Sequence, residues 1–547
     1  MRHILIWLLI PAFFVSAAPP TQRISPGGEI KLRHILDDGL LGQPRAPNSR
    51  DYRGAMADFY RSQDYALAWI MDWRATPQTR ALVKLLADAE DDGLRAEDYE
   101  GPQWPERLRE LEKRSKPSES DQIAFDAGFT AAVMRYVSDR HVGRINPQRF
   151  HFELTVDRAK QPLAQFLREK LEQSPDVVAT LRSIDPVFPA YDRLLKAYRL
   201  YRSYAGRDDG KALPIPRKAV RPGNPYNGLP RLRQLLALWG DLPAQESIGN
   251  ETRYTGPIVE AVKHYQRRHG LTESGNIDPR TLEQLNVPLS RRVRQFQLTL
   301  ERLRWLPHGF ARPPLVVNIP EFRLHVDDEK LHWTFFMNVV VGKAYKHKTP
   351  VFESRIERVI FRPFWNIPKS IQREEVVPKI EKGPGYLASH DFEVVDRKDN
   401  VVTRGAVDAA TLQGLRSGSL SVRQRPGPDN SLGLVKFVMP NGHDIYLHGT
   451  PAKQLFSQAR RDFSHGCIRV EDPAKLAAWV LREKPEWTPQ KIRAAMEGTE
   501  TVTVELGEPI PVLVIYGTAA VMENGERRFF DDIYGYDKTL EEALGKP

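Results

Sequence analysis

The stretch Ser464-His465-Gly466-Cys467-Ile468-Arg469-Val470 contains the one cysteine of a 547-residue sequence. A lone thiol cannot form a disulfide within its own chain, so a structural bridge is excluded. A thiol is nucleophilic as the thiolate, which a nearby imidazole usually helps to form at neutral pH. Because His448 and His465 both lie close in the sequence, the stretch predicts a nucleophilic site. The alternative is a small buried apolar side chain.

The residues just before this stretch predict a β-hairpin that ends at His448. Residues 434–439 and 444–448 are β-prone runs, and the Asn441-Gly442 pair between them is the strongest short hairpin signal. Side chains alternate along a strand, so Tyr446 and His448 share one face. The hairpin is therefore predicted to direct a phenol and an imidazole to the same side.

A mostly-β domain is predicted around this site. From residue 313 the sequence changes to β-branched and aromatic runs broken by proline or glycine. We place this domain at residues 313–504, and we expect residues 505–547 to be a C-terminal extension that packs on it or on the helical region. The strands predicted before the hairpin are residues 315–319, 322–326, 335–341 and 356–361.

The chain before residue 313 is predicted to be helical and divided in two. Apolar residues at helical spacing run through residues 51–211 and predict a helical scaffold domain. A proline-rich segment at 212–228 predicts a linker, and residues 229–290 predict a compact module of three short helices. The expected fold class is multidomain α + β.

The N-terminus predicts export. Residues 1–18 contain Arg2 and His3, an apolar run and then small residues, which is the pattern of a secretory signal peptide. The run is shorter than the ~20 residues of a membrane span, and an uncleaved anchor is the alternative to cleavage. Residues 19–50 are rich in proline, glycine and charge and predict a linker. An exported protein that keeps one unpaired thiol indicates that the thiol is used.

Charge limits the classes of partner. The formal net charge is +10, but 80 basic side chains are interspersed with 70 acidic ones. This mixture favours a solvated surface over a nucleic-acid groove, and it is compatible with an acidic polymer as partner. We therefore expect no nucleic-acid partner.

His448-Gly449-Thr450, followed after a short segment by Ser464-His465-Gly466-Cys467, resembles the signature of the L,D-transpeptidase (YkuD-type) catalytic domain. Residues 340–343, 363–368 and 428–434 resemble the large periplasmic YcbB-like branch of that family. The helical pattern of residues 229–290 resembles a peptidoglycan-binding module. The resemblance covers nearly the whole mature chain, and it implies a capping insertion at about residues 368–430.

The resemblance implies acyl transfer in two steps, without a cofactor or metal. The Cys467 thiolate attacks a tetrapeptide stem before its terminal D-alanine, D-alanine leaves, and an amine of a second stem resolves the thioester as a 3→3 cross-link. The implied partners are donor and acceptor peptidoglycan stems and wall-synthesis enzymes, in the periplasm. Membrane contact is expected only through an uncleaved signal.

The resemblance also implies roles for individual residues. His448 is the general base and later the acid, and the Gly449 carbonyl orients its imidazole. The backbone N–H groups of His465, Gly466 and Cys467 are the expected oxyanion donors. The expected substrate contacts are Ser464, Tyr446, Arg469, Trp365 and Asn366. For Tyr446 and Trp365, simple packing is an equal alternative.

Two other classes of function stay open at this point. His443, His448, His465 and Cys467 offer ligands for a zinc-dependent wall hydrolase. Against zinc, His443 is predicted on the opposite strand face from His448, and the His-x-Cys spacing is unusual. The second alternative is a catalytically inert peptidoglycan-binding wall protein.

Overall fold

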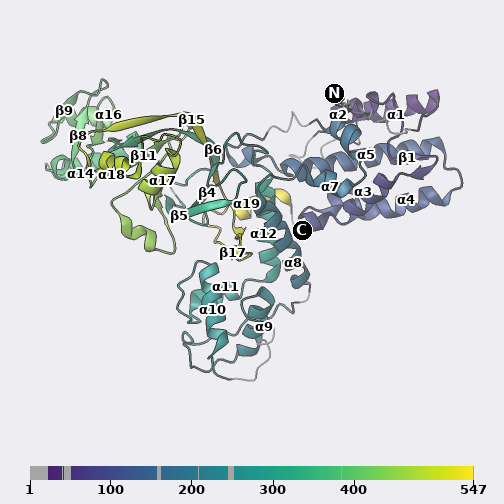
Figure 1. The fold of residues 1–547 in the computed structure, drawn as a ribbon, viewed down its shortest axis with the longest axis horizontal. Helices are drawn as coiled ribbons and strands as arrows, with labels where there is room; N and C mark the ends of the chain where they lie inside the picture. The colour runs from purple at the N-terminus through teal and green to yellow at the C-terminus, as the bar shows by residue number, and fades with distance from the viewer. Residues whose placement is uncertain are drawn as a thin grey trace, which may run out of the picture. The chain divides into compact units, whose positions relative to one another are not determined.

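The computed structural model describes residues 22–39, 41, 51–156, 162–206, 208–243, 252–345, 347–383 and 385–545. These residues form two compact units, one from those described up to residue 144 and within 162–185, the other from those within 145–156 and 186–545 (Figure 1). The signal peptide predicted at residues 1–18 lies outside the described residues. None of the helices in the described part of the chain has both the length and the apolar character of a membrane span.

The N-terminal unit is helical, as predicted, and is organised around α5 (Glu119–Val142). The Ser118 side chain accepts a hydrogen bond from the Asp121 N–H at the start of this helix, and Gly143 follows its last residue. Its buried residues lie on all sides of the helix, as expected for a central helix. The elements around it are α2 (Arg53–Arg61), β1 (Ile70–Met71), β2 (Arg74–Ala75), α3 (Pro77–Ala87), η1 (Ala89–Asp92), η2 (Ala96–Tyr99), η3 (Gly101–Gln103), α4 (Trp104–Lys113), α6 (Leu163–Phe166), η5 (Leu167–Leu171) and α7 (Val177–Arg182).

A helix within residues 19–50 corrects the prediction of a linker there. Helix α1 (Pro26–Asp38) begins after the capping residue Ser25, whose backbone N–H and hydroxyl both donate to the Glu119 carboxylate. Its Leu32 is fully buried in the core of the unit. The buried residues of this helix are Leu32 and a glycine, so its sequence has little apolar periodicity that would predict a helix. Its position is decided by the contact with α5.

The second unit begins with helices that pack together. Helix α8 (Pro189–Ala205) lies beside α12 (Leu289–Leu303), and both share a core with α9 (Leu229–Trp239), α10 (Pro257–Arg268) and α11 (Pro279–Leu285) (Figure 1). The last three helices are those predicted for residues 229–290. Helix α8, predicted within 51–211, packs in this second unit, and the sequence did not show this because helical periodicity identifies a buried face but not its partner.

A β-barrel follows, as the predicted mostly-β domain. In the described residues its strand order is β13-β5-β14-β12-β11-β6-β15-β3-β4, and β4 also pairs with β5, which closes the sheet on itself. The strands are β3 (Leu315–Asn318), β4 (Arg323–Asp327), β5 (Trp333–Gly342), β6 (Phe352–Phe361), β11 (Val435–Val438), β12 (Leu447–His448), β13 (Asp462–Ser464), β14 (Ile468–Val470) and β15 (Val502–Ile515). Helices α17 (Pro473–Val480) and α18 (Pro489–Glu497) and turns η4 (Pro147–Phe150) and η8 (Lys453–Ser457) lie in the same unit.

Strand β15 corrects the boundary predicted at residues 504/505. It continues through that point beside β6 (Figure 1). It is antiparallel to β6 and parallel to β3, with a register shift between Glu505 and Ile510. Gly507 and Pro509 lie at this irregularity. Bulges tolerate both residue types, so they do not end the strand here.

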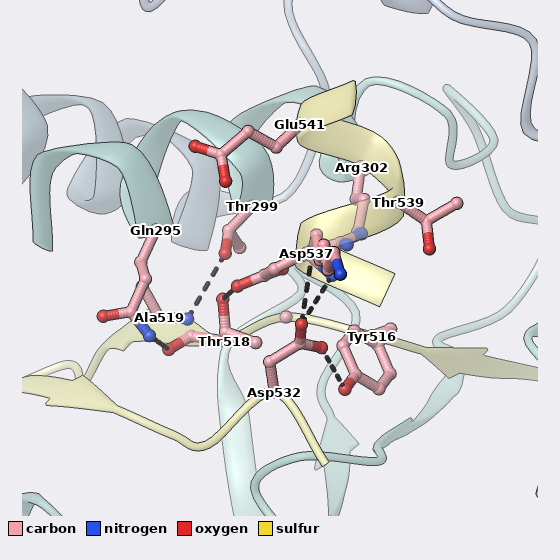
Figure 2. Close-up of polar contacts among 12 residues, drawn as sticks. Gln295, Thr299, Arg302, Tyr516, Thr518, Ala519, Asp532, Asp537, Thr539 and Glu541 are labelled. Atoms are coloured by element: carbon pink, nitrogen blue, oxygen red, sulfur yellow. Dashed lines mark hydrogen bonds and ion pairs between the residues drawn. The ribbon is translucent and has the colours of Figure 1, made fainter. Parts of the chain in front are cut away.

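The remaining C-terminal segment docks on α12. It contains β16 (Ala519–Val521), β17 (Arg527–Phe529) and α19 (Tyr536–Leu544). Asp537 accepts hydrogen bonds from Arg302 Nη1 at 2.5 Å and from Thr518 Oγ1 at 2.6 Å (Figure 2). Asp532 accepts from the Tyr516 hydroxyl at 2.7 Å and from the Asp537 N–H at 3.1 Å, so α19 is held at its first turn.

The insertion expected at about residues 368–430 forms a small subdomain, called the cap below. Its sheet has the order β7-β10-β8-β9 and its own apolar core around Val394 and Leu415. It interrupts the connection between β6 and β11, which are neighbours in the barrel. Its elements are β7 (Trp365–Asn366), α13 (Lys369–Ile371), η7 (Gln372–Val376), α14 (Val377–Lys382), α15 (Tyr386–Ser389), β8 (Phe392–Val395), β9 (Val401–Thr403), α16 (Ala409–Ser417) and β10 (Ser421–Gln424).

Candidate active site

Strand register brings the cysteine and the histidine to one face of the barrel. β12 pairs with β11 so that His448 lies opposite Lys436, and with the parallel strand β14 so that His448 lies beside Arg469. The alternate residues Leu447 and Ile468 are fully buried in the barrel core. Because side chains alternate along a strand, the outer face carries Lys436, Tyr446, His448, Cys467 and Arg469.

Hydrogen bonds within the loop hold Cys467 just before β14. The Ser464 hydroxyl donates to the Cys467 carbonyl at 2.6 Å and accepts from the Gly466 N–H at 3.1 Å, while Thr349 Oγ1 donates to the Gly466 carbonyl at 2.7 Å. Gly466 has φ +116°, and a Cβ there would lie 3.1 Å from Ile445 Cδ1. Glycine is therefore required for this turn.

These bonds bear on two roles expected in this loop. The Gly466 amide, expected as an oxyanion donor, is already bound to Ser464. Ser464, expected as a substrate contact, is 2% exposed, and its hydroxyl is used within the loop. The motif alone did not show that the serine and the glycine bind each other.

His448 is held as a neutral imidazole. Its Nδ1 lies 2.5 Å from the Gly449 carbonyl oxygen, and the ring is 4% exposed. A carbonyl oxygen can only accept, so Nδ1 carries the proton and Nε2 is left as the proton acceptor. Burial, together with the nearby Arg469 charge, lowers the pKa of His448 to about 3. The imidazole is therefore unprotonated and able to act as a base at neutral pH.

The Cys467 thiol is partly buried and has polar neighbours. Burial raises its pKa, while the backbone and hydroxyl of Tyr446 and the charges of Lys436 and Arg469 act in the opposite direction. The sulfur also lies 3.7 Å from the Asp444 carbonyl oxygen, to which its S–H donates. The Tyr446 hydroxyl contacts both this sulfur and Trp365 of the cap.

Lys436 was missed by the sequence analysis. Its Nζ lies 3.8 Å from the centre of the Tyr446 ring, a cation–π contact on the same face as the thiol. The available signal was a charged residue inside the apolar run 434–439, in a position that the hairpin places opposite His448.

The other predicted residues lie at the cap. His465 Nε2 lies 2.6 Å from Glu375 Oε1 on η7, and its ring centre lies 4.7 Å from that of His347, so its imidazole points to the cap. Glu375 and His347 carried no sequence signal. Asn366 is exposed on β7 opposite Arg423, and no hydrogen bond described for the chain joins it to Cys467 or His448.

His443 does not join the other histidines. Its Nε2 lies 3.0 Å from Glu153 Oε1, and its ring contacts Phe352. In the part of the chain that the structure describes, no group of three or more His, Cys, Asp or Glu residues is arranged to hold a metal ion. The ligand set considered for zinc is therefore not assembled.

Known families match three parts of the chain. Residues 54–197 match a family described as "Scaffold domain", residues 227–285 one described as "Putative peptidoglycan binding domain", and residues 313–512 the YkuD family, described as "L,D-transpeptidase catalytic domain". The last range contains Cys467, His448 and the cap, and it extends through most of β15.

Two individual proteins are similar to this chain. A "Putative L,D-transpeptidase" of Haemophilus influenzae is 32% identical over 258 residues, which are 46% of this chain and 51% of that protein. The match thus spans about half of the relative's length. A crystal structure of an L,D-transpeptidase (residues 123–326) from Xylanimonas cellulosilytica covers 55% of this chain and 99% of its own, at 14% identity and a TM-score of 0.18. A score that low supports no conclusion about the fold.

The family matches agree with the closed barrel and with the cysteine and histidine motifs that meet on its outer face. Residues 313–512 therefore belong to the YkuD family of L,D-transpeptidase catalytic domains, in a chain that also carries a peptidoglycan-binding domain.

Proposed function

We propose that the protein forms 3→3 peptidoglycan cross-links by acyl transfer from a tetrapeptide stem through a thioester on Cys467. The observation that carries this proposal is the pairing of β12 with β14, which puts the thiol and the His448 imidazole on one face. The bond from His448 Nδ1 to the Gly449 carbonyl leaves Nε2 as the base. A peptidoglycan-binding domain in the same chain supports the same substrate.

In the first step the sulfur forms a bond to the stem carbonyl carbon. The thiol proton leaves, the tetrahedral intermediate collapses to the thioester, and D-alanine departs with a proton returned through His448. In the second step an acceptor amine attacks the thioester, its proton passes to His448, and the thiolate is released. No other reactant is needed for these two steps.

The developing oxyanion needs donors that are not already used. Since the Gly466 amide binds Ser464, we propose the backbone N–H groups of His465 and Cys467 for this role. One such donor is typically worth ~10²–10³ in rate. Arg469 and Tyr446, on the face with the thiol, are placed to contact the stem, and the Arg469 guanidinium suits its carboxylates.

The proposed role of the cap is to favour attack on the thioester by the acceptor amine over attack by water. Aminolysis of the thioester requires that the acceptor is held close while water is excluded. The contact from Glu375 to His465, two residues before the nucleophile, joins the cap to the catalytic loop. We propose that this contact holds the cap over the face that carries Cys467.

Removing this contact is expected to shift the products toward hydrolysis. For Glu375→Ala we expect the ratio of cross-linked dimer to hydrolysed stem to fall about two- to fivefold, because partly exposed ion pairs contribute about 0.5–1 kcal/mol. Glu375→Gln keeps a hydrogen-bonding group and should lose less. Product ratios by mass spectrometry check this, with Glu374→Ala, an exposed carboxylate on the same turn, as the control. Equal ratios in Glu375→Ala and the control would show that the contact does not hold the cap.

Location and partners follow from the substrate. Peptidoglycan stems lie outside the cytoplasm, so we propose that the protein works in the periplasm beside wall-synthesis enzymes. The donor and acceptor stems are its proposed direct partners.

The test of the proposed function uses the purified chain and a disaccharide tetrapeptide. Mass spectrometry is expected to detect a dimer that has lost one D-alanine and an acyl adduct on Cys467. Loss of D-alanine without any dimer would indicate a carboxypeptidase. Neither product with an active acceptor present would refute the proposal.

A further inference from the structure

Two basic side chains on the outer face form no ion pair in the described residues, although the Asp444 carboxylate acts on Lys436 from a distance. Lys436 on β11 and Arg469 on β14 flank His448 from the two neighbouring strands. In the described residues neither forms an ion pair, and Arg469 Nε is buried without a hydrogen-bond partner. Partly buried cations that form no ion pair cost free energy, so a fold that keeps them indicates an anion that forms or binds at this face.

Lys436 is directed toward the cysteine by Tyr446. Its Nζ lies 3.8 Å from the centre of the Tyr446 ring. The hydroxyl and backbone N–H of the same tyrosine meet the Cys467 sulfur, and the lysine charge acts on that sulfur too. The ammonium is therefore held within electrostatic reach of the nucleophile.

His448 is poorly suited to be the counter-charge of a thiolate. Its ring is 4% exposed, and both flanking strands place a cation beside it. A proton on this imidazole would add a third positive charge to a buried position. A stable thiolate–imidazolium pair, which activates many cysteine enzymes, is therefore disfavoured here.

We propose that Lys436, with Arg469 beside it, supplies the positive charge that stabilises the Cys467 thiolate, so that the thiolate does not depend on an imidazolium of His448. This inference deepens the proposed function and rests on Cys467 being its nucleophile. The thiol proton passes transiently to Nε2 of His448, which gives it to the departing amine of D-alanine. The neutral imidazole is then available to take the proton of the acceptor amine in the second step.

The charged and titratable groups that face the thiol determine the sign of the expected effect. They are Lys436 of β11, Asp444 and Tyr446 before β12, His448 of β12 and Arg469 of β14, while Arg358 of β6 acts on Lys436 and pairs with Glu505. Loss of the Lys436 charge removes one cation and leaves the Asp444 carboxylate less opposed. The thiolate is then harder to form, and the pKa of Cys467 rises.

The test measures how fast iodoacetamide alkylates Cys467 between pH 6 and about 11.5, using intact-protein mass spectrometry on the full chain. The chain has one cysteine, so the signal comes from one site. We expect the pH midpoint of alkylation to rise by about one unit in Lys436→Met, in line with the effect of a nearby opposite charge. Lys436→Arg should restore the midpoint to within a few tenths of a unit. Lys491→Met is the matched control, because Lys491 also lies over an aromatic ring, that of Trp487, but on α18.

The His448→Ala variant shows whether the imidazole or Lys436 supplies the positive charge that stabilises the thiolate. We expect its alkylation midpoint to move by less than half a unit, because the imidazole carries no charge in this range. A larger rise in His448→Ala than in Lys436→Met would overturn the proposal, and so would an unchanged midpoint in Lys436→Met. If Lys436→Met does not fold, Lys436→Gln is measured in the same way.

Two further measurements separate this inference from a structural role and from the proposed function. Loss of a partly buried cation should leave the melting temperature of Lys436→Met unchanged or raised, while kcat for cross-linking falls. A lower melting temperature together with an unchanged pH midpoint of alkylation would indicate that the lysine has a structural role. Alkylation requires no peptidoglycan. If the wild-type protein makes no cross-links, the proposed function fails, whereas the alkylation midpoints still decide the role of Lys436.

Discussion

Replacement of Cys467 by alanine is expected to reduce formation of the cross-linked dimer at least ~10⁴-fold, because removal of a covalent nucleophile leaves only binding and oxyanion stabilisation. The thiol lies at the end of a rigid turn, and no other cysteine exists to replace it. The measurement is dimer formation from disaccharide tetrapeptide, followed by mass spectrometry. The acyl adduct should be absent from the variant.

Binding to sacculi provides the matched readout for this variant. The helices α9, α10 and α11 share a core that does not include Cys467, so sedimentation with purified sacculi should be the same in Cys467→Ala and wild type. Cross-linking retained in Cys467→Ala would exclude a thioester route. If the wild-type protein binds sacculi but forms no cross-linked dimer, it is instead the catalytically inert wall-binding protein considered above.

Replacement of Asp537 by alanine is expected to destabilise the docking of α19 by about 3–5 kcal/mol, because it leaves the Arg302 guanidinium buried without its charge partner. Arg302 and Asp537 are 6% and 1% exposed, and Asp537 also accepts from Thr518 (Figure 2). Hydrogen exchange of the α19 amides measures the loss of docking free energy directly. We expect exchange at least ~10²-fold faster in Asp537→Ala than in the wild-type protein.

Glu541 on the same helix is the matched control. It pairs with Arg291 and Arg294 but is 31% exposed, so Glu541→Ala should cost less than about 1 kcal/mol. The double variant Arg302→Met, Asp537→Leu should recover most of the loss, since removal of both charges leaves neither unpaired. Equal protection of α19 in Asp537→Ala and Glu541→Ala would contradict a dominant role for the buried pair.

The central part of the candidate site was accessible from the sequence because it depends on local patterns. The hairpin signal and the period of two predicted that Tyr446 and His448 share a face, and in the structure their ring centres lie 5.7 Å apart. The spacing to Cys467 then predicted the thiol and imidazole as a pair, and the pairing of β12 with β14 puts them on one face. The Gly449 carbonyl, expected to orient the imidazole, does lie against its Nδ1.

Other parts of the site depend on segments that meet only in the folded chain. Nothing local distinguishes Lys436 from a lysine on a solvated strand until β11 is placed beside β12. Glu375 lies in the cap, and its contact with His465 joins residues far apart in the sequence. The use of the Gly466 amide by Ser464 depends on the conformation of one turn.

The sequence by itself determined the order of the parts: helices before a three-helix module, then a β-rich domain with a lone thiol behind a hairpin histidine. Periodicity, turn chemistry and motif spacing are local properties, so they can be read without knowledge of partners. The tertiary structure decided that α8 packs beside α12 and that β15 continues the barrel as the parallel neighbour of β3. It also decided which charges surround the thiol, because burial and long-range strand pairing depend on the whole fold and not on neighbouring residues.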